Sequence, residues 1–102
     1  MTLAIDLDGV LHDHLNPKPG RRMGLPMEGA VNAMIRLKQL GHTLIIHSVW
    51  GDRRKVIADW CDYYSIPYDD ITNIKPEAAV YLDDKALAFT TWDETMTILE
   101  GL

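Results

Sequence analysis

Acidic residues follow two short apolar segments of this chain. Asp6 and Asp8 follow the first segment, and Asp83 and Asp84 follow a later one. Two carboxylates about 4 Å apart repel each other by about 4 kcal/mol at an effective dielectric constant near 20. That is a large part of the net stability of a domain, about 5–15 kcal/mol. If these four carboxylates meet, the cluster therefore predicts a bound cation, and its oxygen ligands favour Mg²⁺ over zinc.

The Asp6-Leu7-Asp8-Gly9 sequence could carry out phosphoryl transfer. A carboxylate such as that of Asp6 can accept a phosphoryl group and give an aspartyl-phosphate that water later hydrolyses. The second acid, Asp8, can donate a proton to the leaving oxygen. Gly9 lets the backbone approach a phosphate closely because it has no side chain.

Two further residues could hold a phosphoryl group. Ser48 ends another apolar segment, and its hydroxyl, with the amides of a following helix start, could contact phosphoryl oxygens. Lys75 comes shortly before the segment that ends at Asp83, and its ammonium could neutralise charge that develops on the reacting phosphorus. We therefore expect Asp6, Asp8 and Lys75 to be catalytic, and Ser48, Lys75 and Gly9 to bind phosphate.

Apolar segments of strand length alternate with segments of helical spacing. Strands are predicted at 3–7, 43–47, 68–72, 79–82 and 86–92, and helices at 27–40, 51–64 and 93–99. This alternation predicts βαβ units and a parallel sheet with helices on both faces. The expected fold is α/β, a three-layer α/β/α Rossmann-like parallel sheet of about five strands in a single domain, 1–102. Ligands of such sheets bind beyond the carboxyl ends of the strands, where Asp6, Ser48 and Asp83 are expected.

Residues 12–26 hold three of the five prolines and read as a loop. A loop of this length in so small a domain is usually functional, and we expect it to cover the site as a flap. His12 and His14 flank Asp13 at its start, a spacing that could suit a metal. The prediction for both is instead an exposed loop position, from which they could still contact the substrate. Trp50 is expected at the mouth of the site, where it could stack on a base.

Four segments together resemble the motifs of the haloacid dehalogenase-like (HAD) phosphohydrolases. The first is Asp6 to Leu11, and the second is the apolar strand 43–47 with Ser48. The third is Lys75 followed by Pro76, and the fourth is Tyr81-Leu82-Asp83-Asp84. The four occur in the family's order and span most of the chain.

The resemblance implies a role for each of these residues. Asp6 would be the nucleophile and a magnesium ligand, and Asp8 the general acid/base with its backbone carbonyl on the metal. Ser48 and Lys75 would hold the phosphoryl group. Asp83 would be a direct or water-mediated metal ligand, with Asp84 beside it. The implied activity is magnesium-dependent hydrolysis of phosphate monoesters.

The chain has no room for the cap domain of larger members. Only the loop 12–26 lies between the first motif and the helix predicted at 27–40. Only 26 residues (49–74) separate Ser48 from Lys75. The chain therefore resembles the capless group, whose members often act on large substrates or borrow a lid from a neighbouring subunit. A homo-oligomer would shield the site in that way.

Composition narrows the setting and the partners. The net charge of −5 argues against broad binding to nucleic acid. Two short basic runs, 18–22 and 53–55, read as solvated surface or as contacts to a nucleotide or a phosphorylated nucleic-acid end. No apolar run approaches the ~20 residues of a membrane helix. Cys61 is the single cysteine, which fits a reducing, cytoplasmic setting.

Two other functions fit the same sequence features. One is a phosphate-binding or regulatory domain with little turnover. The other is a receiver-type domain, which also has an acidic cluster, a Ser or Thr and a Lys on an α/β sheet. The early position of Asp6 in the chain counts against the receiver, because a receiver's phosphoacceptor follows its acidic pair.

Overall fold

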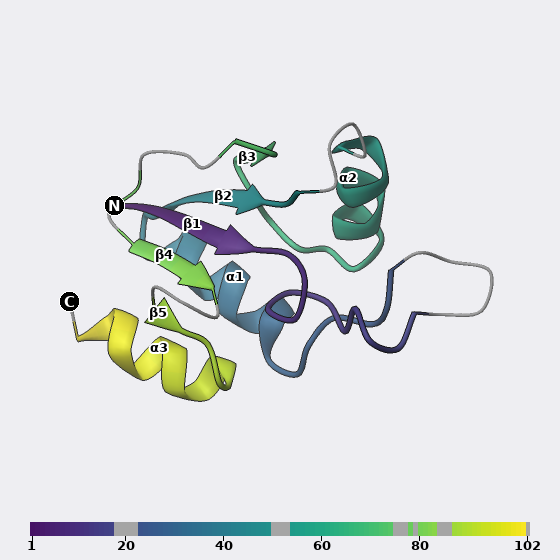
Figure 1. The fold of residues 1–102 in the computed structure, drawn as a ribbon. Coiled ribbons are helices and arrows are strands. Elements are labelled where there is room, and N and C mark those ends of the chain that lie inside the picture. The colour runs from purple at the N-terminus through teal and green to yellow at the C-terminus, as the bar shows by residue number, and fades with distance from the viewer. Residues whose placement is uncertain (18–22, 50–53, 75–77, 79, 84–86, 102) are drawn as a thin grey trace.

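The computed structural model describes residues 1–17, 23–49, 54–74, 78, 80–83 and 87–101. In these residues, five strands form one parallel sheet in the order β3-β2-β1-β4-β5 (Figure 1). The strands are β1 (Thr2–Asp6), β2 (Thr43–His47), β3 (Asp70–Thr72), β4 (Val80–Asp83) and β5 (Leu87–Ala88). The prediction of a small α/β domain with a parallel sheet is therefore confirmed.

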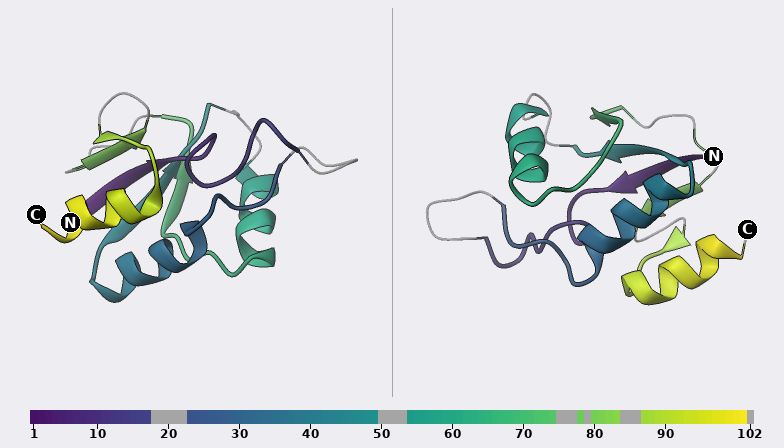
Figure 2. Two further views of the ribbon diagram at one scale, coloured as in Figure 1. Left: turned by 90° about the horizontal axis from the view of Figure 1, so that it is seen from below. Right: turned by 180° about the vertical axis from the view of Figure 1, so that it is seen from behind.

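Three helices accompany the sheet in the described ranges: α1 (Ala30–Gln39), α2 (Arg54–Tyr63) and α3 (Trp92–Glu100). Helix α1 joins β1 to β2, and α2 joins β2 to β3. Helix α1 lies behind the sheet in Figure 1 and in front of it in the right view of Figure 2, and α3 packs against α1. The three-layer arrangement stays a prediction. No helix in the described ranges is long and apolar enough to cross a membrane.

Part of the core lies between α1 and one face of the sheet. Strand alternation places Leu3 and Ile5 of β1 on one face, and their register partners on β2 are Leu44 and Ile46. All four are buried, and they form one cluster with the apolar residues of α1: Ala30, Ala33, Met34 and Leu37. On the opposite face, Ile45 and Tyr81 are only half-buried. Helix α1 is therefore held against this face of the sheet by apolar packing.

Several predicted boundaries shift by a few residues, and two of these shifts have a local reason. Helix α1 begins at Ala30 rather than Met27, because Gly29 has a φ of +83°, a left-handed conformation that helical residues do not adopt. The last strand is shorter than predicted, and Trp92 is already helical. Thr91 ends the extended segment there, since its hydroxyl accepts the backbone N–H of Glu94 as an N-cap.

The strand order creates a switch point beside β1. The chain runs from β1 outward through β2 to β3, and β4 and β5 lie on the other side of β1. In open α/β sheets, ligands bind outside the carboxyl ends of the strands where the order reverses. The switch point here lies at the carboxyl ends of β1 and β4.

Candidate functional site

Three of the predicted site residues have backbones at one edge of the sheet. Ile5 and Leu82 are register partners, so Asp6 and Asp83 each come one residue later on adjacent strands. Asp6 is in turn paired with His47, which precedes Ser48. Because adjacent strands lie about 4.8 Å apart, these three backbones meet at the switch point.

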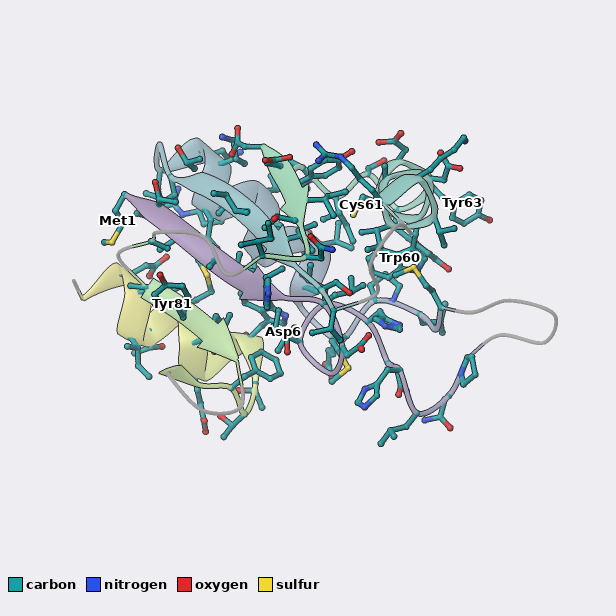
Figure 3. All side chains as sticks on the ribbon, turned by 45° about the horizontal axis from the view of Figure 1, so that its top comes forward. Met1, Asp6, Trp60, Cys61, Tyr63 and Tyr81 are labelled. Carbon is teal, nitrogen blue, oxygen red and sulfur yellow. The ribbon has the colours of Figure 1, made fainter. Side chains whose placement is uncertain are left out.

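The carboxylate of Asp6 is oriented by the chain that follows it. Asp6 is half-buried, and its Oδ1 accepts the backbone N–H of Leu7 at 3.0 Å. The same N–H lies 3.1 Å from the carbonyl oxygen of His47, the register partner of Asp6. The first acid is therefore held at the rim of the sheet, as Figure 3 shows at the end of β1.

The loop after β1 is a tight turn with a buried interior. The N–H groups of Leu11 and His12 both donate to the carbonyl of Leu7, and that of Gly9 donates to the carbonyl of His12. Gly9 has a φ of +76°, a conformation that L side chains rarely adopt, which explains glycine at this position. Leu7, Val10 and Leu11, which lie between the polar positions, are buried.

Helix α3 holds this loop from the far end of the chain. The indole N–H of Trp92 donates to the carbonyl of Val10 at 2.9 Å, and Trp92 is itself buried. Only the tertiary structure brings these residues, 82 positions apart, together. The loop that carries Asp8 is therefore fixed by a buried hydrogen bond.

Asp8 pairs with His12, a histidine whose burial we did not predict. Its Oδ1 lies 2.7 Å from Nε2 of His12, and 32% of the Asp8 side chain is exposed. We predicted an exposed loop position for His12, but its side chain has 0% exposure. The prediction was wrong because the loop folds back and the rings of His12 and Trp60 pack edge to face, with their centroids 5.8 Å apart. The spacing Asp-x-x-x-His was the available signal. His14 is exposed, as predicted.

The predicted loop 12–26 is closed at its base. Asp13 N–H donates to the carbonyl of Leu25, and Met27 N–H donates to that of Leu11, so the two ends pair in antiparallel fashion. The described parts of the loop, 12–17 and 23–26, lie beyond the carboxyl end of β1 (Figure 1). Residues 18–22 lie outside the described residues. A flap over the site stays a prediction.

Ser48 is the second predicted phosphate ligand that the structure describes. It is 4% exposed, and its backbone N–H donates to the carbonyl of Thr72 at 3.0 Å. This bond extends the pairing of β2 and β3 by one step. Lys75, Asp84 and the side chain of Asp83 lie outside the described residues, as does Trp50.

The described residues contain only part of the predicted metal-ligand set. In the part of the chain that the structure describes, no group of three or more His, Cys, Asp or Glu side chains could hold a metal. The described share of the predicted ligand set is Asp6 and Asp8, which offer oxygen donors only. Oxygen ligands at the carboxyl edge match Mg²⁺ rather than a softer metal.

The second basic run is partly neutralised. Arg54 pairs with Asp70 of β3, and Lys55 pairs with Asp59 one turn along α2. Arg53 and the first run, 18–22, lie outside the described residues. These exposed pairs favour the solvated-surface interpretation for Arg54 and Lys55.

Cys61 has no sign of reactivity. It is fully buried on α2, beside the labelled Trp60 in Figure 3. Burial raises the pKa of its thiol to about 12, and the nearby Asp62 charge adds to the effect. The thiolate that nucleophilic chemistry needs is therefore scarce at neutral pH.

Comparison with known proteins supports the fold. No family model matches the sequence, and no curated protein matches it. A solved structure that is similar is that of a conserved protein coded by a locus from Bacteroides thetaiotaomicron. It is 23% identical, with a TM-score of 0.81, and the match covers 99% of this chain and 90% of that one. At this identity the match shows the shared fold alone.

Proposed function

We propose that this protein is a capless HAD-type phosphatase that hydrolyses phosphate monoesters through an aspartyl-phosphate on Asp6. One observation carries the proposal. Asp6 and Asp83 follow a register pair on the two strands that flank the switch point, where ligands of α/β sheets bind. The strand order and parallel pairing also support the three-layer Rossmann-like architecture of that family.

The proposed reaction has two displacements. A carboxylate oxygen of Asp6 attacks phosphorus, and the bond from phosphorus to the leaving oxygen breaks while Asp8 supplies a proton to that oxygen. Water then attacks phosphorus, Asp8 takes a proton from it, and the carboxylate of Asp6 leaves. Ser48 and Lys75 hold the phosphoryl oxygens, and Gly9 lets the backbone approach them.

The proposed cofactor is Mg²⁺. Asp6, Asp8 through its backbone carbonyl, and Asp83 with Asp84 would hold it. When bound, it would offset the charge of the phosphate and of the carboxylates around it. The cytoplasm, where magnesium and phosphate esters occur together and Cys61 stays reduced, is the proposed location.

The strand order favours this proposal over a receiver domain. Flavodoxin-like domains of the receiver type have the order 2-1-3-4-5, in which β1 lies next to β3. In this protein β1 lies next to β4, and β3 is at the edge. In the order found here, the proposed nucleophile Asp6 lies at the end of β1, beside the switch point.

Hydrolysis of an aryl phosphate with Mg²⁺ tests the proposal. We expect the wild type to turn over and the Asp6→Asn variant to fall to background, at least about 10³-fold lower, because the nucleophile is lost. Asp59→Asn, an exposed change on α2, is the matched control and should keep full activity. EDTA should abolish the wild-type rate.

The opposite result has a defined meaning. A wild type no faster than Asp6→Asn contradicts the enzyme and leaves the phosphate-binding or regulatory domain. Once turnover is seen, a panel with nucleotides and 3′- or 5′-phosphorylated oligonucleotides identifies the substrate.

A further inference from the structure

His12 has both ring nitrogens committed, and this fixes where its proton lies. The backbone N–H of Gly24 donates to Nδ1 at 3.1 Å. An amide N–H can only donate here, so Nδ1 carries no proton and Nε2 carries it. The Nε2–H group therefore donates to Oδ1 of Asp8 at 2.7 Å.

Gly24, which donates to the His12 ring, is itself held by a second hydrogen bond and by close packing. The carbonyl of Gly24 accepts the indole N–H of Trp60 at 2.9 Å, while its N–H holds the imidazole. A Cβ at Gly24 would lie 2.1 Å from the carbonyl oxygen of Asp13, so no other residue fits without a shift of the backbone. A continuous chain of contacts thus runs from α2 through the loop 12–26 to Asp8.

The contacts that end at Asp8 matter because they restrict the orientation of its carboxylate. About a third of the Asp8 side chain is exposed, so the side chain has room to adopt other rotamers. A hydrogen bond from a fully buried ring, itself bonded to the Gly24 N–H, selects one of them. Displacement of a reacting group by about 1 Å can reduce a rate about 100-fold.

We propose that His12 is a positioning residue that holds the Asp8 carboxylate in the orientation needed for proton transfer to the leaving oxygen. This inference rests on the proposed function, because it assigns Asp8 the acid/base role. The ring is not a proton relay in this arrangement, since Gly24 N–H occupies Nδ1. His12 acts through Asp8 and does not contact the substrate.

Two substitutions separate the two bonds of the ring. In His12→Asn, the side-chain oxygen can take the place of Nδ1 and accept the Gly24 N–H, but nothing reaches Asp8. In His12→Gln, the longer side chain brings an amide N–H to the place of Nε2, so the bond to Asp8 can form. Both replacements are polar and similar in size, which makes them a matched pair.

We expect His12→Asn to lower kcat for an aryl phosphate about 10- to 100-fold, with KM within about 2-fold of the wild type. His12→Gln should recover most of that loss. His42→Asn, at the opposite end of the sheet beside the N-terminus, should leave both parameters unchanged. Circular dichroism and thermal unfolding of all three variants report whether each has folded.

A measurement on the wild type covers the case in which a variant does not fold. The ¹⁵N shifts of the His12 ring should report the Nε2–H tautomer. A proton on Nδ1, wild-type kcat in His12→Asn, or equal losses in the Asn and Gln variants would each overturn the inference. If the wild type turns over faster than Asp6→Asn while one of these results holds, only the inference fails. If the wild type does not turn over faster, the proposed function fails too.

Discussion

Asp6 and Asp83 stand one residue beyond the paired Ile5 and Leu82, at the carboxyl ends of adjacent parallel strands. Their backbones are separated by a single strand spacing, although 76 residues of sequence lie between them (7–82). The proposed Mg²⁺ would offset the repulsion between two carboxylates in this relationship.

The first prediction concerns metal binding. Asp83→Asn should weaken Mg²⁺ binding at least about 10-fold in isothermal calorimetry, because it removes one of the charged oxygen donors. Asp59→Asn should bind like the wild type, since Asp59 is exposed on α2 and pairs only with Lys55 among the contacts described. Unchanged affinity in Asp83→Asn would remove Asp83 from the proposed ligand set.

Gly24 gives a prediction about stability. Gly24→Ala should reduce the free energy of unfolding by about 3 kcal/mol, because the new Cβ meets the backbone carbonyls of Asp13 and Asn16. The control is Gly41→Ala, where φ is +89° and no heavy atom lies within 4 Å of the new Cβ. There we expect a loss of about 1 kcal/mol from the backbone conformation alone. Urea denaturation measures both. A loss at Gly24 no larger than at Gly41 contradicts the packing shown here.

Asp69 predicts a pH dependence of stability. The pKa of the Asp69 carboxyl lies below its ordinary value of 3.8. The hydrogen bond from the backbone N–H of Leu44 is the largest cause, and the ammonium of Lys38 adds to it. A lowered folded pKa means that the stabilisation is complete above the unfolded pKa and is lost as the pH falls through the folded one.

The Asp69→Asn variant should therefore be less stable than the wild type at pH 7, by about 1 kcal/mol after solvent screening of this partly exposed pair. The difference should shrink as the pH drops below 3.8. Denaturant unfolding at several pH values measures it, with Asp59→Asn as the exposed-pair control. A difference that is constant with pH would show that the charge of Asp69 has no part in it.

The cap of α3 gives the last prediction. Thr91→Ala should cost about 1 kcal/mol of stability, because the N–H of Glu94 loses its acceptor. Thr97→Ala is the matched control within the same helix. Its hydroxyl bonds back to the carbonyl of Asp93, a contact that contributes little to a helix, so its loss should be near zero. Equal losses for Thr91 and Thr97 in thermal unfolding would contradict the capping role.

Local pattern was sufficient for most of the elements. The strand 43–47 has the predicted bounds, and Gly41 and Ser48 flank it closely on either side. The shifted starts of α1 and α3 depend on single residues, Gly29 and Thr91, whose backbone or side-chain geometry decides where a helix begins. Amino-acid spacing alone does not determine these.

The sequence by itself determined that acids and a serine follow apolar strands, and hence that they face one edge of an α/β sheet. Tertiary structure decided which strands are neighbours, because sheet order depends on how the helices pack and not on any local pattern. It also decided that the His12 side chain is buried. Burial of that ring requires Trp60 from α2 and Gly24 from the loop to meet it, and these contacts, 12 and more residues away in sequence, exist only after the chain has folded.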